Sequence, residues 1–342
     1  CMPNIWQYAN ESEWYQNHFS SSNGTRFSMF GLYFGVPSYY WDNFESSHKS
    51  PVLINELLAQ GYDIKIHTSA TLKSPPFYRI LFQRVPHLQI DTPGKTVYDR
   101  DAEITKEMIH DINNKKKGKP FYGLLFYDLA HSFQIPEDKL KKFQPSWKYA
   151  DYEALSNDMD PTPFWNLYRN CCYQIDGFVA KVLKTLKEKG MDKNTIVIIS
   201  GDHAQEFNEN HKNYWGHGGN FTKWQVCIPL IVHEPGKAAK KYHHRTTHYD
   251  VASTILHNYL GVTNSYSDYS YGTNLNDTRN RGWITVGENL VYAFIAEKDI
   301  IIKKEGDGNI DITDANLNPI DNYHINNKAF NAAMKKLNHF YK

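Results

Sequence analysis

Short apolar runs alternate with amphipathic stretches along most of the chain. Short apolar runs typical of strands cover residues 63–67, 121–127, 195–200 and 226–232, and the run at 195–200 is rich in β-branched residues. Apolar residues recur at helical spacing in residues 51–60, 102–113, 163–189 and 249–260. Strands that alternate with helices favour a mostly parallel central sheet with helices on both faces. We therefore predict an α/β fold.

The two ends of the chain follow other patterns. Residues 4–15 are predicted as a short helix, followed by a polar loop at 20–26 and an apolar, helix-compatible run at 27–34. After residue 281, short alternating strands are expected at 283–286, 291–294 and 299–303, with a closing helix at 327–339. We therefore predict an α/β domain over residues 1–280 and a small C-terminal α+β subdomain over residues 281–342 that packs on it.

Composition narrows the classes of function. Lys and Arg number 38 against 37 Asp and Glu, so the net charge is +1, which argues against nucleic acid as a partner. Four cysteines do not make a disulfide scaffold. No apolar run approaches the roughly 20 residues that span a bilayer. The 24 tyrosines and 8 tryptophans indicate either a hydrated tyrosine-rich surface or a surface for sugars or lipid headgroups.

Candidate chemistry begins where an apolar strand ends. Gly201-Asp202-His203 directly follows the run at 195–200, and ligand sites of α/β sheets lie at the carboxyl ends of their strands. His217 and His248 follow downstream. Divalent cations favour carboxylate and imidazole ligands, so these residues predict a metal-centred site for phosphoryl or sulfuryl chemistry. The alternative is that the histidines only hold loops together by hydrogen bonds.

Several ordered motifs carry a family resemblance. Residues Asn194–His203 resemble the N-T-x-V-x-x-x-S-D-H signature of the alkaline phosphatase/sulfatase superfamily. Met2–Ile5, Ile228–Gly236 and Thr247–Asp250 are similar to its P-N-I, V-P-L-I-I-x-x-P-G and S-H-x-D segments. The resemblance extends over about residues 1–275 and implies a sulfatase-like fold.

One branch of the superfamily fits best. Phe19–Arg26, Phe30–Pro37, Ser74–Arg79 and Trp215–Gly218 resemble the YejM/PbgA type of inner-membrane protein, which is related to lipoteichoic-acid synthases and phosphoethanolamine transferases. The resemblance implies a location on the periplasmic face of the bacterial inner membrane. It also implies an upstream transmembrane segment and phospholipid or lipopolysaccharide headgroups as partners. The oligomeric state stays open.

The resemblance also implies roles for single residues. Thr25 would be the nucleophile, Arg26 would neutralise phosphoryl oxygens, and His131 matches a histidine on the substrate side. Ser22 is the competing nucleophile, and Thr25 can also be interpreted as a helix N-cap. Because no cysteine occupies the position of Ser22, the formylglycine of true sulfatases is not available, and sulfatase activity is not expected.

The resemblance implies a divalent metal (Mn, Mg or Zn) as cofactor. The expected ligands are Thr25, Asp202, His203, His217 and His248. The family's first strand ends in a further acidic ligand, which we expect upstream of residue 1, so one ligand and one central strand would lie outside this chain. A site short of one carboxylate is expected to bind metal less tightly.

Two functions follow from the resemblance. The first is a metal-dependent phosphatase or phospho-headgroup transferase that acts on envelope lipids through Thr25. The second is a non-catalytic domain that binds lipid and regulates how much cardiolipin or lipopolysaccharide the outer membrane contains. The first requires Thr25 and the Asp202–His203 pair to meet in one cavity, whereas the second does not.

Overall fold

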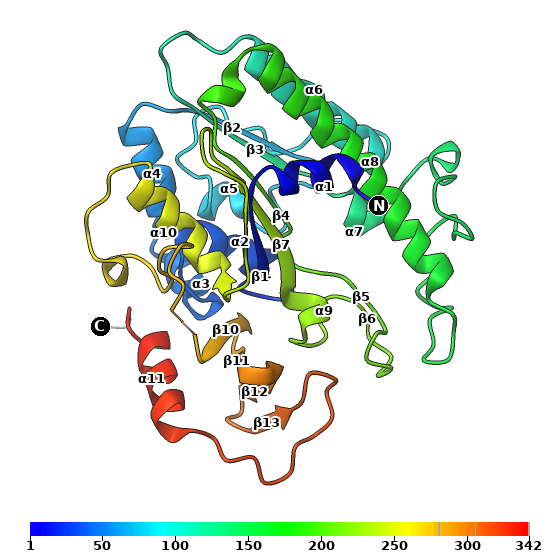
Figure 1. Cartoon of the computed structure of the whole chain (residues 1–342), viewed down its shortest axis with the longest axis vertical. Coiled ribbons are helices and arrows are strands. Elements are labelled where there is room, and N and C mark those ends of the chain that lie inside the picture. The colour runs from blue at the N-terminus through cyan, green and yellow to red at the C-terminus, as the bar shows by residue number, and fades with distance from the viewer. Residues whose placement is uncertain (280, 305, 341–342) are drawn as a thin grey trace. The chain divides into compact units, whose positions relative to one another are not determined.

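Helices and strands alternate through the first 260 residues of the computed structural model, which describes residues 1–279, 281–304 and 306–340 (Figure 1). The helices are α1 (Pro3–Asn10), α2 (Thr25–Phe34), α3 (Trp41–Ser46), α4 (Val52–Ala59), α5 (Phe77–Ile80), α6 (Val97–Asn113), α7 (Leu129–Ser132), α8 (Thr162–Glu188), α9 (Lys223–Val226), α10 (His248–Asn258) and α11 (Asn327–Leu337). The strands are β1 (Glu13–Phe19), β2 (Asp63–Thr68), β3 (Phe121–Phe126), β4 (Val197–Ser200), β5 (Glu206–Phe207), β6 (Trp215–Gly216), β7 (Cys227–His233), β8 (Lys240–Tyr242), β9 (Thr246–Thr247), β10 (Trp283–Glu288), β11 (Val291–Ala296), β12 (Ile301–Lys304) and β13 (Ile310–Thr313).

The chain forms two compact units. The first unit contains Cys1–Trp14, Leu57–Ile198 and Ile231–Lys241. The second unit contains Tyr15–Glu56, Ile199–Leu230 and Tyr242–Lys342. This division groups the C-terminal strands with earlier segments of the chain, so the domain boundary expected at residue 280 stays a prediction.

Most of the predicted elements are present. The four predicted strands correspond to β2, β3, β4 and β7, and the four predicted helices to α4, α6, α8 and α10. Helix α6 begins five residues earlier than predicted because Thr96 caps it. The Thr96 hydroxyl accepts the amide hydrogen of Asp99 at 3.2 Å, and the Asp99 carboxylate accepts that of Thr96 at 3.0 Å.

The predicted helix over residues 4–15 is wrong in its second half. Helix α1 ends at Asn10, and β1 starts at Glu13. Tyr15 and Phe19 of β1 are buried, and aromatic side chains of this kind favour a strand that packs on a core. β1 pairs in parallel with β9, with His18 opposite Thr246 and Phe19 opposite Thr247.

The α/β class is confirmed, but the central sheet is mixed rather than mostly parallel. Its five strands follow the order β4-β7-β1-β8, and β9 pairs with β1. Only a short turn connects β7 to β8. Because this turn is too short for the crossover helix that a parallel βαβ unit needs, the two strands do not form such a unit. β2 and β3 form a separate parallel pair, and β5 and β6 form a short antiparallel hairpin.

In the first unit, α6 and the long helix α8 pack on apolar side chains of β3 and β4. Met108, Ile112 and Leu186 are buried there, and Leu125 and Val197 pack against them. β3 and β4 are nevertheless less buried than predicted, and Ile198 is 36% exposed. The reason is their position, since in the described part of the chain β3 pairs with β2 alone and β4 lies at the end of its sheet.

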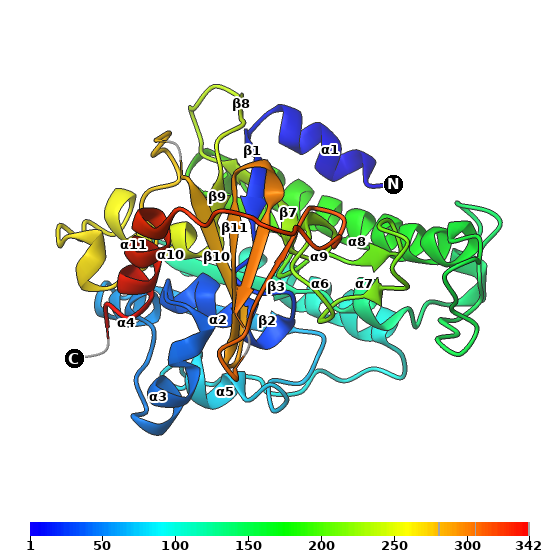
Figure 2. The same cartoon turned by 90° about the horizontal axis from the view of Figure 1, so that it is seen from below.

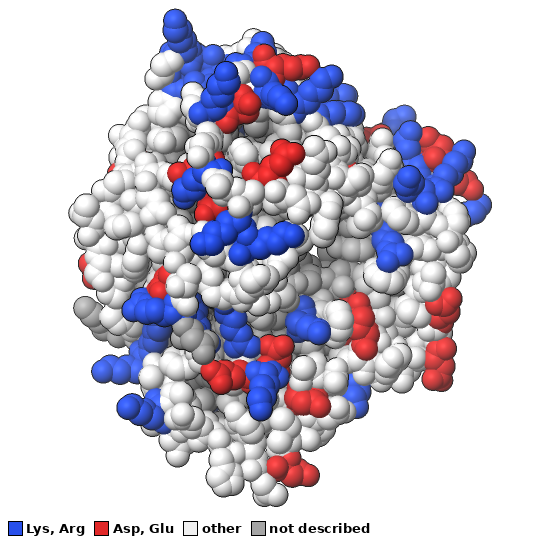
Figure 3. Space-filling model, viewed as in Figure 1, with Lys and Arg blue, Asp and Glu red and all other residues white. Residues whose placement is uncertain are grey.

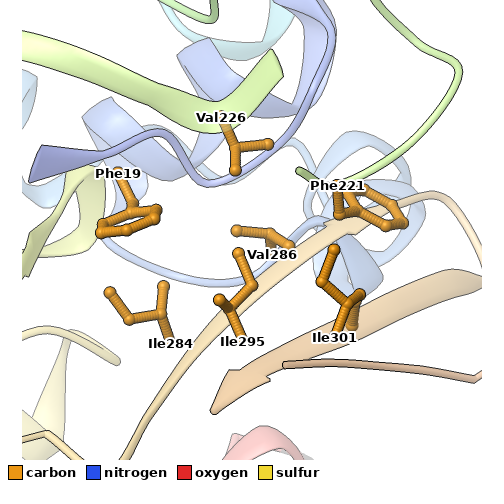
Figure 4. Close-up of a cluster of buried hydrophobic side chains, with 8 residues drawn as sticks. Phe19, Phe221, Val226, Ile284, Val286, Ile295 and Ile301 are labelled. Carbon is orange, nitrogen blue, oxygen red and sulfur yellow. The ribbon is translucent and has the colours of Figure 1, made fainter. Parts of the chain in front are cut away.

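In the second unit, the predicted C-terminal sheet and closing helix are confirmed. The antiparallel order is β10-β11-β12-β13, with β13 as an additional strand. One face of this sheet carries Ile284, Val286, Ile295 and Ile301. These side chains pack on Phe19 at the end of β1, on Phe221, and on Val226 at the end of α9 (Figure 4). The other face, with Phe294 and Ile302, is covered by Ala333 of α11.

Charged residues are spread over the surface. Lys and Arg are interspersed with Asp and Glu on the face shown in Figure 3, as the near-zero net charge leads one to expect. Within the described residues, no helix is both long and apolar enough to cross a membrane.

A buried carboxylate on α8 holds the start of α1. Asp176 is 1% exposed and accepts hydrogen bonds from the amides of Asn4 at 3.1 Å and Ile5 at 2.8 Å, and from Asn4 Nδ2 at 2.6 Å. The carboxylate therefore caps a helix that lies more than 170 positions away in the sequence, where negative charge is favourable.

We predict that Asp176→Ala lowers the free energy of unfolding by about 1–3 kcal/mol, because it leaves these amide donors without an acceptor. Urea unfolding followed by circular dichroism measures the change. Glu188→Ala, on the same helix but 61% exposed, is the matched control and is expected to change stability by less than about 0.5 kcal/mol. Equal effects of the two substitutions would show that the cap contributes nothing.

Candidate active site

Thr25 is the first residue of α2. The N-cap is Gly24, which has an extended backbone and no side chain to bond the first amides. The interpretation of Thr25 as the N-cap is therefore wrong by one residue. The helix start presents its backbone N–H groups and the positive end of its dipole beside the Thr25 hydroxyl, an arrangement that favours an anion.

The serine loop before Thr25 is fixed by its own hydroxyls. Ser21 Oγ donates to the carbonyl of Phe27 at 3.1 Å, and Ser28 Oγ donates to the carbonyl of Ser22 at 2.9 Å. Ser22 is fully buried, and its hydroxyl accepts the amide hydrogen of Gly24 at 3.3 Å. Thr25 is partly exposed. Of the two candidate nucleophiles, Thr25 is thus the one that a substrate can reach.

The structure brings Thr25 and the Asp202–His203 pair together within the second unit. Thr25 Oγ1 lies 3.2 Å from His203 Nε2, and Asp202 Oδ2 lies 3.5 Å from the same nitrogen. His203 Nδ1 lies 3.0 Å from the carbonyl oxygen of Ala204. Because a carbonyl can only accept, Nδ1 carries the hydrogen, and Nε2 of a neutral ring presents its lone pair to Thr25.

Asp202 is ionised in this setting. Burial by itself raises the pKa of Asp202, but the positive charge of the His203 ring when it is protonated and a hydrogen bond from Thr25 outweigh burial and hold its pKa below the usual value. The carboxylate is 18% exposed, so it combines a fixed negative charge with access from outside.

The two downstream histidines have different surroundings. The His217 ring, after β6, lies 4.2 Å from the His203 ring, and its Nδ1 is 3.4 Å from Gln205 Oε1. His248, the first residue of α10, is fully buried and its Nε2 donates to the carbonyl of Gly201 at 3.2 Å. Burial lowers the pKa of His248 to about 4, although Asp202 works against this effect.

His18 is a residue that the sequence analysis missed. It stands near the end of β1, fully buried, with its ring 5.4 Å from the His248 ring and Nδ1 2.9 Å from Thr246 Oγ1. Burial, and then the neighbouring His248, lowers its pKa. The sequence gives little signal for it, because residues 13–19 mix polar and aromatic side chains and the predicted helix ended at residue 15.

A buried amide network joins the serine loop to the loop that carries His217. Asn23 accepts the amide hydrogen of Gly218 at 3.0 Å and donates through Nδ2 to the carbonyl of Asn220 at 2.9 Å. Glu206 accepts from Asn220 Nδ2 at 2.7 Å and from Gln225 Nε2 at 2.6 Å. These bonds fix the loop after β6 against the residue that precedes Gly24, and so they hold His217 near Thr25.

Two predicted residues have other neighbours in the described part of the chain. Arg26 is exposed, and its guanidinium lies 5.6 Å from the Trp41 ring centroid. His131 belongs to the first unit, where its side chain is 57% exposed and its Nδ1 lies 3.5 Å from Asp128 Oδ1. The roles expected for Arg26 and His131 stay predictions.

The predicted metal ligands do not complete a metal site by themselves. Asp202 and His203 offer the right donor atoms, and one ring nitrogen each of His18 and His248 is buried without a hydrogen-bond partner among the described residues. Over the described part of the chain, however, no group of three or more His, Cys, Asp or Glu side chains is arranged to hold a metal ion. The five-residue metal site therefore stays a prediction.

The burial of His248 predicts a pH dependence of stability. Its pKa is about 4 in the folded chain against an ordinary 6.5, so the unfolded chain binds more protons between these values. Stability therefore falls as the pH drops from 6.5 towards 4. Between pH 7 and pH 5, we expect wild type to lose on the order of 2 kcal/mol more than His248→Gln, measured by urea unfolding.

His18 stays buried in both proteins and its pKa is lowered in both, but His248→Gln removes one cause of that shift, so the measured difference includes the effect of His248 on His18. If the two proteins lose the same stability between pH 7 and pH 5, His248 is not the group that resists protonation.

Comparison with known proteins places the chain in a family. The model of the family described as "Sulfatase" matches residues 2–262. The inner membrane protein YejM of Salmonella typhimurium is 23% identical over 294 residues, which cover 85% of this chain and 44% of that protein. The chain thus spans less than half the length of this relative.

Solved structures show the same fold. The phosphonate monoester hydrolase of Agrobacterium radiobacter matches with a TM-score of 0.71 at 14% identity, over 99% of this chain and 90% of that one. The lipoteichoic acid synthase LtaP of Listeria monocytogenes matches with a TM-score of 0.62 at 16% identity, over 99% and 85%. At these identities the likeness concerns the fold alone. With a family model that covers most of its length, this chain belongs to the sulfatase family of the alkaline phosphatase superfamily.

Proposed function

We propose that this chain transfers phosphoryl or phospho-headgroup units of envelope lipids, with Thr25 as the nucleophile. The observation that carries the proposal is the position of Thr25 Oγ1, 3.2 Å from His203 Nε2, at the open start of α2. A hydroxyl becomes a useful nucleophile only when a neighbouring group takes its proton. The single hydroxyl hydrogen of Thr25 has two acceptors in reach, Nε2 of a neutral His203 ring and the Asp202 carboxylate, and donates to one of them at a time.

The chemical step can be written with these residues. As Thr25 Oγ1 forms a bond to phosphorus, its proton passes to His203 Nε2, and the bond from phosphorus to the leaving oxygen breaks. The protonated His203 gives this proton to the leaving oxygen, which departs as an alcohol. The amides at the start of α2 bind the phosphoryl oxygens, and Arg26 is the cation closest in sequence to support them. Neutral His203 then takes the proton of water or of a second alcohol as that oxygen bonds to phosphorus, and it returns the proton to Thr25 Oγ1 as the bond from Thr25 to phosphorus breaks.

The test is a set of nucleophile variants. With p-nitrophenyl phosphate as the probe, we expect Thr25→Ala to lower the rate by at least about 10³-fold and Thr25→Ser to keep part of it. Ser22→Ala is the comparison variant and is expected to lower the rate by less than about tenfold, because its buried hydroxyl does not react and only accepts one hydrogen bond from Gly24. Mass spectrometry of the quenched reaction is expected to find phosphate on Thr25.

Members of the superfamily are typically metal-dependent, so each variant is assayed with and without Mn²⁺, Mg²⁺ and Zn²⁺. The proposal fails if Ser22→Ala abolishes turnover while Thr25→Ala does not, or if wild type and Asp202→Ala are equally inactive under every metal condition.

A second candidate is a domain that binds lipid without catalysis. It is supported by the incomplete ligand set in the described residues and by the similarity to YejM, which is named an inner membrane protein. We expect this domain to co-sediment with vesicles that contain cardiolipin or lipopolysaccharide and not with pure phosphatidylcholine vesicles. Binding that is unchanged in Asp202→Ala and Thr25→Ala would support it, and absence of binding to every vesicle would contradict it.

A further inference from the structure

A polar cavity lies on the second unit, and none of its lining residues belongs to the Thr25–His203 cluster. Its volume is about 400 Å³, within the range of small-molecule sites. The lining residues are His257, Asn258, Tyr266, Asn274, Asn276, Asp277 and Arg279. All seven side chains are polar or amphipathic, and none of them is an aliphatic residue that would favour an apolar ligand.

Internal hydrogen bonds show which polar atoms of this cavity are already engaged. Asn274 Nδ2 donates to Asn258 Oδ1 at 2.8 Å and to the hydroxyl oxygen of Tyr266 at 3.3 Å. Asn276 Oδ1 accepts from Tyr15 at 3.0 Å. Within the described residues, the amide NH₂ groups of Asn258 and Asn276 and the hydroxyl hydrogen of Tyr266 have no acceptor, and they remain as donors for a ligand.

The cavity also offers a hydrogen-bond acceptor on His257. His257 Nδ1 lies 3.1 Å from the carbonyl oxygen of Val262, so this nitrogen must carry the hydrogen and donate. In the neutral ring, Nε2 then has a lone pair to offer. The His257 ring stands edge-on to the Tyr266 ring, with 5.3 Å between their centroids. The cavity thus combines several donors with an imidazole acceptor beside a phenol ring.

The charges of the cavity cancel. Arg279 donates through Nε at 2.8 Å and through Nη2 at 2.5 Å to the carboxylate of Asp277. This bidentate pairing with Arg279 lowers the pKa of Asp277 to about 2, so both groups stay charged and compensate each other. A strongly anionic ligand would find no uncompensated cation here, and a phosphate dianion would have no hydrogen to give to His257.

From this pattern, we propose that the cavity is a binding site for a neutral carbohydrate. A sugar hydroxyl is both donor and acceptor, so a polyol satisfies the amide donors of Asn258 and Asn276 and the acceptor of His257 at the same time. The site is separate from the proposed nucleophile and does not depend on the proposed function. It would give a protein of this fold a means to hold a glycosylated molecule.

The test uses the full chain and sugars of known composition. Saturation-transfer NMR with glucose, N-acetylglucosamine, mannose and maltose detects binding, and titration gives the Kd. We expect a saturable response to at least one of the four sugars. Asn258→Ala and Arg279→Gln are expected to weaken binding about three- to tenfold each, the effect of losing one hydrogen bond or the group that aligns Asp277.

Asn264→Ala is the matched control, because Asn264 is exposed in the same region but does not line the cavity. Its Kd is expected to equal that of wild type, and circular dichroism confirms that each variant is folded. The proposal is overturned if none of the four sugars gives a saturable response, if Asn264→Ala weakens binding as much as Asn258→Ala, or if inorganic phosphate competes with the sugar for the site.

Discussion

The hydrogen bond between Thr25 and His203 joins residues 178 positions apart, and the candidate site exists only because the fold maintains it. The start of α2 and the end of β4 have to meet within the length of one hydrogen bond. On the side of α2, the buried serine loop sets the backbone so that Gly24 leaves the first amides open. On the side of β4, the carbonyl of Ala204 fixes which nitrogen of His203 turns to Thr25.

The C-terminal sheet contributes to this meeting although it carries none of the predicted site residues. Its apolar face packs on Phe19, just before the serine loop, and on Phe221 and Val226, just after the loop with His217. The amide of Gly287 also donates to the carbonyl of Ser21 at 3.0 Å. The C-terminal sheet therefore supports the candidate site. It packs on the segment before the serine loop and on the segment after the loop with His217, and the amide network joins the same two loops.

The sequence was informative where periodicity was strong and where several motifs agreed. The helices α6, α8 and α10 and the strands β2, β3, β4 and β7 were predicted from apolar spacing, and the pairing of Thr25 with Asp202 and His203 was expected from the family resemblance. β1 was not predicted, because Glu13–Phe19 mixes polar and aromatic residues and its burial depends on partners far along the chain. For the same reason His18 and the network of Asn23, Glu206 and Gln225 could not be anticipated, since tertiary contacts alone give these residues their partners.

The position of β3 has a consequence for handling the molecule in solution. Its sequence, Phe-Tyr-Gly-Leu-Leu-Phe, is apolar, uncharged and free of proline, and in the described part of the chain only β2 pairs with it. A segment with these properties is of the kind that forms intermolecular β-structure when local opening of the fold exposes it. Self-association through this strand would grow with protein concentration and would mask the behaviour of a single chain, so dilute samples are the appropriate state for study.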